Sequence, residues 1–452
     1  MKLSQFTIVQ EDYPQKGHHL VYNTLSRALL EIDNQCLSML YSLEEREPQK
    51  SAKQVLSKLK EMGIVVETEL DEAESYHQKF SFNRKNANQL NTTILTTLSC
   101  PMRCIYCYQK HIKNGGDMSQ SIMEKTTSWL KDKILELKCK RSSITFYGGE
   151  PLMNFTPIEY IGNRMSEYCL SVGISLYLSM VTSGVLLTQK IAEKLKRIGL
   201  KYLQITLDGD RDAHDKRRFF KDGSGTFDKI LENLRYLIEY FFITITCNVD
   251  KTNTEAAYRL VDILYSQGLT GKIKRLVFGP VSAPFELAQS QHIACPEMSG
   301  EDLTKLTLYA AKRGFASDLR PRHKICGMLL PSSFVIDPNG ILYTCPAFLG
   351  KEEYQVGNIN SQSLEGIYTT LSNFDLPEEC LGCAYVPICA GGCRFNALLE
   401  HGDIKAIICQ KEKFSSSLPL LIKAHYDIRS KNVQSPDFTY DNFIPKRKSK
   451  IN

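Results

Sequence analysis

The sequence predicts an α/β protein in which a parallel sheet is flanked by two segments of different character. From Asn91 onward, short strand patterns alternate with amphipathic helix patterns. Before that point strands come first and helices second, and after about residue 315 cysteine, glycine and proline replace the alternation. Six β-then-α units in a row imply parallel strands joined by right-handed crossovers.

Length, composition and charge limit the function classes. A chain of 452 residues with 42% hydrophobic and 23% charged residues is of ordinary globular type and long enough for two or three domains. A net charge of +6 is too dilute to indicate a nucleic-acid partner. No apolar run of about 18 residues predicts a membrane span, and residues 1–6 lack a secretion-signal pattern. We therefore expect a cytoplasmic protein without a nucleic-acid or membrane partner.

Residues 1–88 are predicted to form a winged-helix-like module. Its three strands are expected at residues 6–9, 19–22 and 28–32. Two helices are expected at 34–45 and 52–62, followed by a wing-like strand at 64–67. Gly63 stands where a helix-ending residue is expected.

Residues 89–314 carry the alternating pattern. Strands are expected at 93–98, 143–147, 175–182, 202–207, 242–249 and 273–278. Helices are expected at about 119–138, 157–172, 188–198, 227–240, 254–267 and 300–314. In such a sheet the chemistry gathers at the carboxyl ends of the strands.

Three cysteines follow the first of these strands. Cys100, Cys104 and Cys107 lie within one short loop. A structural zinc site usually has four ligands, whereas three leave one position open. A 4Fe-4S cluster with one iron that lacks a protein ligand meets this description.

The Cys-x3-Cys-x2-Cys spacing, with Tyr106 before the third cysteine, resembles the radical S-adenosylmethionine (SAM) superfamily. The resemblance implies a partial (β/α)6, TIM-like barrel over residues 89–314. It also implies that Cys100, Cys104 and Cys107 are the catalytic cluster ligands, that the fourth iron chelates the amino and carboxylate groups of SAM, and that Tyr106 contacts adenine. Chance spacing or a zinc site is the alternative.

The second strand of the sheet ends Gly148-Gly149-Glu150. Paired glycines let a ligand approach the backbone closely, and Glu150 could accept hydrogen bonds from an ammonium group. In radical SAM enzymes this segment holds the methionine amine, which the resemblance therefore implies here.

Later strand ends resemble the peptide-modifying branch of the superfamily. Ser183 stands where relatives often have Asn, so it is a candidate ribose contact. Thr206 and Arg218 are candidates for holding the SAM carboxylate, and Asn248 matches a common Asn. Each of these polar residues could instead be an ordinary strand-end cap.

A second group of cysteines exceeds one tetrahedral zinc site and nearly fills two, which favours two clusters. Its members are Cys326, Cys345, Cys380, Cys383, Cys389, Cys393 and Cys409. The array, with Gly340 between the first two, resembles the SPASM extension of radical SAM proteins. A zinc-only domain is the alternative.

The SPASM resemblance implies two auxiliary 4Fe-4S clusters within residues 315–425. The first would be bound by Cys326, Cys345 and Cys393, and the second by Cys380, Cys383, Cys389 and Cys409. The first cluster then lacks one protein ligand. Cys295 or His323 could supply it, but we favour a site left open for substrate or an exogenous ligand. Residues 426–452 are expected to form a basic tail.

The two resemblances together imply SAM, three 4Fe-4S clusters and hydrogen abstraction by a 5′-deoxyadenosyl radical. The first 88 residues resemble modules that bind the leader of a precursor peptide as an added strand. The expected product is a peptide with a thioether or carbon–carbon crosslink, and the expected electron donor is a protein such as flavodoxin or ferredoxin.

Three alternatives stay open at this point. The first 88 residues could be a structural cap on the barrel. The protein could be an anaerobic sulfatase-maturing enzyme, although those carry an acidic residue where this chain has Pro346. It could also be a non-catalytic iron–sulfur binding protein, against which the intact three-cysteine motif argues.

Overall fold

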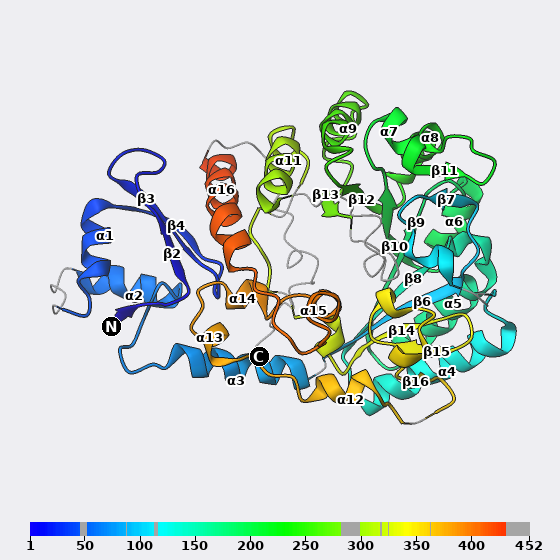
Figure 1. Cartoon of the computed structure of the whole chain (residues 1–452), viewed down its shortest axis with the longest axis horizontal. Helices are drawn as coiled ribbons and strands as arrows, with labels where there is room; N and C mark the ends of the chain where they lie inside the picture. The colour runs from blue at the N-terminus through cyan, green and yellow to red at the C-terminus, as the bar shows by residue number, and fades with distance from the viewer. Residues whose placement is uncertain are drawn as a thin grey trace, which may run out of the picture.

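The chain folds around one nine-stranded sheet (Figure 1). The computed structural model describes residues 1–45, 52–86, 88–112, 116–281, 299–316, 319–323, 325–361 and 363–430. The strand order in the sheet is β13-β12-β10-β9-β8-β6-β14-β15-β16. This arrangement confirms the predicted α/β class.

Six parallel strands form the core of the sheet, each close to its predicted position. They are β6 (Gln89–Thr97), β8 (Arg141–Gly148), β9 (Ser175–Thr182), β10 (Leu200–Thr206), β12 (Phe242–Val249) and β13 (Arg275–Pro280). The helices of the alternating units are α4 (Gln120–Glu136), α5 (Phe155–Ser171), α6 (Gln189–Arg197), α8 (Phe227–Leu237), α9 (Thr254–Ser266) and α11 (Gly300–Lys312).

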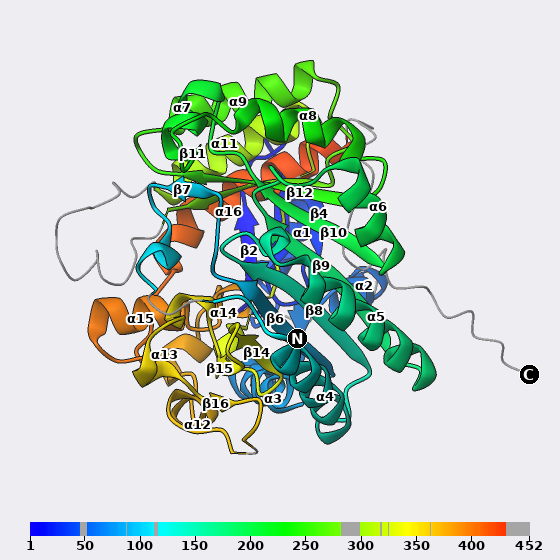
Figure 2. The same cartoon turned by 90° about the vertical axis from the view of Figure 1, so that its right-hand side faces the viewer.

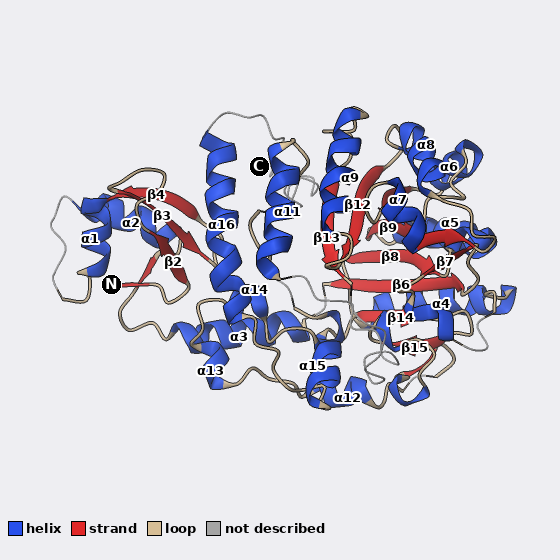
Figure 3. Ribbon diagram, turned by 45° about the horizontal axis from the view of Figure 1, so that its top comes forward, coloured by secondary structure: helices blue, strands red, loops and turns tan. Residues whose placement is uncertain are grey.

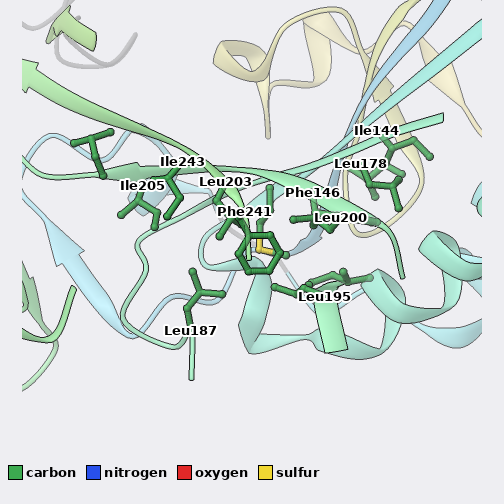
Figure 4. Close-up of a cluster of buried hydrophobic side chains, with 14 of the residues drawn as sticks. Ile144, Phe146, Leu178, Leu187, Leu195, Leu200, Leu203, Ile205, Phe241 and Ile243 are labelled. Carbon is green, nitrogen blue, oxygen red and sulfur yellow. The ribbon is translucent and has the colours of Figure 1, made fainter. Parts of the chain in front are cut away.

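The two faces of this sheet differ in polarity. Apolar side chains such as Phe146, Leu203 and Ile243 are fully buried beside Leu195 of α6 (Figure 4). Because side chains alternate along a strand, the neighbouring residues point to the other face. That inner face carries uncharged polar side chains, among them Asn91, Thr93, Ser143, Thr145, Ser179, Gln204 and Thr246.

The cysteine-rich region continues the same sheet. β14 (Ser333–Ile336) runs parallel to β6, and β15 (Ile341–Tyr343) and β16 (Gly357–Asn358) follow antiparallel. Gly340 turns the chain between β14 and β15 with a φ of +81°, a conformation that favours glycine. The pairing of β14 with β6 crosses the predicted boundary at residue 314, so the division into domains stays a prediction.

Short helices surround the last cysteines. They are α12 (Ile367–Ser372), α13 (Glu378–Leu381), α14 (Val386–Cys389) and α15 (Arg394–His401). Cys380 lies in α13 and Cys389 in α14. Figure 2 shows this yellow-to-orange region on the side of the molecule opposite α5 and α6.

The N-terminal residues form the predicted three strands followed by two helices. β2 (Thr7–Gln10), β3 (His18–Asn23) and β4 (Leu29–Asp33) make an antiparallel sheet, and α1 (Asn34–Tyr41) and α2 (Lys53–Glu61) follow. The strand predicted as a wing, β5 (Val65–Val66), pairs with β1 (Lys2–Leu3). α3 (Glu72–Lys85) then leads to the large sheet.

Helix α16 (Lys411–Ser430) lies between the small N-terminal sheet and α11 (Figures 1 and 3). Tyr22 of β3 packs against Leu418 and Ile422 of α16. Of the predicted basic tail, residues 426–430 are the end of α16, and 431–452 lie outside the described residues. Over the described ranges, no helix has the length and apolar character needed to span a bilayer.

Candidate active site

A cavity of about 920 Å³ opens at the carboxyl ends of the parallel strands. Its volume lies within the range of roughly 300–1,000 Å³ that is usual for ligand sites. The predicted site residues on its walls are Cys100, Cys104, Tyr106, Cys107, Gly148, Gly149, Ser183, Thr206 and Arg218. Residues from five separate segments of the sequence therefore meet at one edge of the sheet.

A short antiparallel pairing holds the three-cysteine loop in place. β7 (Met102–Cys104) pairs with β11 (Arg218–Phe220), so that Cys104 lies opposite Arg218. The Ile105 amide also donates to the Arg217 carbonyl at 3.0 Å. This pairing places a cationic side chain beside the thiols.

The thiols of this loop are partly buried. Burial raises the pKa of the Cys100 thiol to about 11. Burial also raises the pKa of the Cys104 thiol, whereas the positive charge of Arg218 lowers it. Since metal ligands must be deprotonated, cluster binding at this loop would displace protons from these thiols.

The glycine pair packs against the cysteine loop. A Cβ at Gly148 would lie 2.1 Å from the Thr97 carbonyl oxygen, and one at Gly149 would lie 2.4 Å from that of Ser99. The Gly149 amide donates to the Thr97 carbonyl at 3.0 Å. Positions 148 and 149 therefore require glycine because the end of β8 packs closely against the loop that carries Cys100.

Glu150 is fully buried and faces the end of β9, and it is not among the residues that line the cavity. Its carboxylate accepts hydrogen bonds from the Thr182 hydroxyl at 2.7 Å and from the Ser183 amide and hydroxyl at 2.8 and 2.5 Å. The carboxylate thus fixes the turn that presents Ser183. Contact of Glu150 with an ammonium group stays a prediction.

A polar network surrounds the Tyr106 hydroxyl. It donates to Asp208 and accepts from Arg218 Nη1 and Asn248 Nδ2, each at 3.0 Å. Burial raises the pKa of the Tyr106 phenol and that of the Asp208 carboxyl. The positive charge of Arg218 opposes both of these shifts. Arg218 Nε is buried and has no hydrogen-bond partner among the described residues. A buried donor of this kind is expected where an anionic ligand binds.

His214 and Asp215, which shortly precede Arg218 in the sequence, support its position. His214 accepts from the Asp208 amide at 3.1 Å and contacts the Thr226 hydroxyl at 3.0 Å. Asp215 accepts from the Thr226 and Phe227 amides, at the start of α8. These contacts fix the β11 turn on which Arg218 lies.

Sequence analysis missed three groups at this site. Asp208 ties Tyr106 to the Asn248 amide, which donates to it at 2.9 Å. The Tyr108 and Tyr147 hydroxyls lie 3.0 Å apart, and both residues line the cavity. The signal for Tyr147 was its place directly before the glycine pair, and Asp208 stood in the Leu207-Asp208-Gly209 segment without a role.

The auxiliary cysteines lie near one another in the cysteine-rich region, and their division between two clusters stays a prediction. Cys326 and Cys345 line a second cavity of about 240 Å³ on the inner face of the sheet. Burial raises the pKa of the Cys345 thiol to about 12, with smaller contributions from Cys326 and Cys393. Similarly, burial raises the pKa of Cys380 to about 11, and its cysteine neighbours are Cys389, Cys383 and Cys409.

Of the two residues considered as a further ligand, His323 points to the N-terminal module. Its Nε2 lies 2.9 Å from the Thr24 carbonyl oxygen, and burial lowers its pKa. Cys295 lies outside the described residues.

The donor set fits the cofactors that the sequence implies. Three thiols, an arginine with an unpartnered nitrogen, and the polar residues Ser183 and Thr206 line one cavity. Thiolates suit an iron–sulfur cluster, and the cation suits a carboxylate.

Comparison with known proteins supports this fit. Residues 94–262 match the radical SAM superfamily, and residues 326–390 match SPASM, an iron–sulfur cluster-binding domain. The SPASM match replaces the zinc-only interpretation of the second cysteine group.

Relatives fall into more than one activity. A cysteine-type anaerobic sulfatase-maturating enzyme of Clostridium novyi is 24% identical over 70% of this chain and 91% of its own length. The PqqA peptide cyclase of Granulibacter bethesdensis is 25% identical over 68% of this chain and 83% of its own. The radical SAM cyclopropyl synthase TigE of Paramaledivibacter caminithermalis is 25% identical over 48% and 51%.

Solved structures share the fold. The anSMEcpe structure with bound AdoMet has a TM-score of 0.62 at 19% identity and covers 75% of this chain and 99% of that one. SuiB of Streptococcus suis has a TM-score of 0.53 at 16% identity and covers 91% of this chain and 99% of that one. The chain thus contains a radical SAM domain followed by a SPASM iron–sulfur cluster-binding domain.

Proposed function

We propose that this enzyme modifies a ribosomally made precursor peptide by forming an intramolecular thioether or carbon–carbon crosslink. The observation that carries the proposal is that the two cavities lie side by side on the polar inner face of the sheet. Thr145 lines the smaller cavity and Tyr147 the larger, and both belong to β8. Two residues along a strand span only about 7 Å.

The chain's own residues would bind and orient the reactants. Cys100, Cys104 and Cys107 would hold the SAM-binding cluster, and Arg218, with Thr206, would hold the SAM carboxylate. When bound, SAM and its cluster supply a 5′-deoxyadenosyl radical that removes a hydrogen atom from the substrate. The hydroxyl-rich inner face would bind peptide amides and side chains by hydrogen bonds.

The N-terminal module supports a peptide substrate. Strands β2 and β4 are the edges of its sheet, and an extended leader can add to such an edge by main-chain hydrogen bonds. SuiB, which has been crystallised with the precursor peptide SuiA, covers 91% of this chain, whereas anSMEcpe covers 75%. The similarity to SuiB therefore extends over more of this chain than the similarity to anSMEcpe does.

A reducing partner and compartment belong to the proposal. Formation of the radical needs an electron, which a small protein such as flavodoxin or ferredoxin would supply. The cysteines of the described residues are all free thiols, which suits a reducing cytoplasm.

The test is co-expression with the peptide encoded beside the gene, under anaerobic conditions, followed by mass spectrometry of the peptide. A crosslink forms with loss of two hydrogen atoms, and we expect that loss in the full enzyme and not in a variant lacking residues 1–88. An unmodified peptide beside an enzyme that cleaves SAM would contradict the peptide assignment.

Sulfatase maturation is the second candidate, because sulfatase-maturating relatives match most of the chain. Those enzymes have an acidic side chain where this chain has Pro346, which lines the smaller cavity and cannot accept a proton. A sulfatase-derived peptide tests this function, since oxidation of its cysteine to formylglycine creates an aldehyde that a hydrazide probe captures. We expect no capture.

A further inference from the structure

Arg394 is a fully buried arginine in the middle of the SPASM region. It follows Cys393 directly and begins α15. Its Nη2 donates to the Gly391 and Gly392 carbonyls, in the turn between Cys389 and Cys393. The guanidinium is therefore bonded to the segment that joins the two auxiliary cysteine groups.

The other end of the guanidinium reaches the segment before Cys409. Nη1 donates to the Ala406 carbonyl at 2.7 Å, and more weakly to those of Ile404 and Lys405. The Phe374 ring covers the guanidinium, with its centroid 4.7 Å from Cζ. Every one of these partners is uncharged.

A buried cation with only neutral partners is unfavourable unless an anion lies nearby. Among the described residues, no carboxylate forms an ion pair with Arg394, and its Nε is buried without a partner. The carbonyls that it binds lie in the turn between Cys389 and Cys393 and in the segment before Cys409, so the groups that can supply a negative charge there are the thiolates of these cysteines.

Cys393 belongs to the first auxiliary group, and Cys389 and Cys409 belong to the second. We propose that Arg394 is a positive charge shared by the two auxiliary cluster sites, and that it raises the reduction potential of both clusters. Net charge and hydrogen bonding around a cluster set its potential, and a nearby cation favours the more negative, reduced state. The proposal rests on the iron–sulfur assignment and not on the identity of the substrate.

The experiment is an EPR-monitored redox titration of the reconstituted full-length chain. The Cys100→Ala, Cys104→Ala and Cys107→Ala background removes the SAM cluster, so that only auxiliary signals remain. In this background we compare Arg394→Gln, which removes the charge, with Arg394→Lys, which keeps it. We expect both auxiliary midpoint potentials to move downward in Arg394→Gln and to stay near the parent values in Arg394→Lys.

Arg84 offers a matched control. It is also a buried arginine, and its Nη1 donates to the Leu371 and Ser372 carbonyls at 3.0 Å, but the charge near it is that of Asp375. Arg84→Gln should leave both potentials unchanged.

Three outcomes would overturn the proposal. Unchanged potentials in Arg394→Gln would show that the charge has no effect on the clusters. A shift of only one cluster would show that the charge is not shared. Equal loss of iron in the Gln and Lys variants would show that the carbonyl hydrogen bonds, and not the charge, are what Arg394 provides.

Discussion

The three-cysteine loop and the four-cysteine group are predicted to bind the same kind of cofactor but are held differently. The loop with Cys100, Cys104 and Cys107 lines a large cavity and is supported from one side by β11. The group of Cys380, Cys383, Cys389 and Cys409 lies instead beside the N-terminal module and helix α16.

Side chains of the N-terminal module hold the segment between Cys380 and Cys389. The Tyr76 hydroxyl donates to the Val386 carbonyl at 3.1 Å, and the Thr24 hydroxyl donates to that of Ala384 at 2.5 Å. The Gln5 amide donates to the Leu381 carbonyl at 3.2 Å. The comparison shows that the three-cysteine loop faces a cavity, whereas the segment of the four-cysteine group is also hydrogen-bonded to the N-terminal residues.

The largest effect is expected at the cavity. Arg218→Gln should lower kcat/KM for SAM cleavage about 30- to 1000-fold, because losing one partner of a buried charge pair costs roughly 2–4 kcal/mol. Arg211 is exposed and pairs with Asp228, so Arg211→Gln is the matched control and should be near wild type. Equal kcat/KM values in the two variants would show that Arg218 does not contribute to SAM binding or cleavage.

A second variant tests the structural role of the four-cysteine group. Cys383→Ala should remove about four of about twelve irons and speed amide hydrogen exchange in residues 18–33, because the segment held by Thr24 and Tyr76 would loosen. Cys169→Ala, at a buried position of α5, should change neither. Loss of iron with unchanged amide hydrogen exchange would show that the cluster does not stabilise the N-terminal module.

A smaller effect is expected from a single contact across this interface. Tyr76→Phe removes the hydrogen bond to Val386 and should lower the free energy of unfolding by about 1 kcal/mol. Urea denaturation under anaerobic conditions measures this, with Tyr265→Phe as an exposed control. No difference between the two variants would mean that water replaces the lost contact.

The smallest effect is expected at the edge of the interface. His77 and Asp375 form an ion pair of 2.8 Å, but Asp375 is more than half exposed. Such pairs contribute roughly 0–1 kcal/mol, so His77→Ala should change the free energy of unfolding less than Tyr76→Phe does. A larger change in the free energy of unfolding for His77→Ala than for Tyr76→Phe would show that charge, and not buried hydrogen bonds, stabilises this interface.

The sequence predicted those features that depend on local pattern. The six β-then-α units follow from periodicity, and the cysteine groups follow from spacing within short loops. The three-ligand loop could be placed at the cavity because it follows β6 directly, and strand ends of a parallel sheet share one edge.

Features that depend on contacts between distant segments could not be predicted. β14 is a run of four residues whose partner, β6, lies about 240 residues earlier, and nothing in its own pattern specifies that pairing. The two hydrogen bonds that Ser183 donates to Glu150 could not be predicted either, because they join segments about 30 residues apart. Arg394 reads as an ordinary residue after Cys393 until its burial is known.

The most direct test of the central claim is an anaerobic measurement of iron content and 5′-deoxyadenosine release in two proteins. One is wild type, and the other carries Cys100→Ala, Cys104→Ala and Cys107→Ala. We expect about twelve irons and SAM cleavage in wild type, and about eight irons without cleavage in the variant. Zinc in place of iron, or cleavage that survives in the variant, would contradict the assignment of this loop as the SAM-cleaving site.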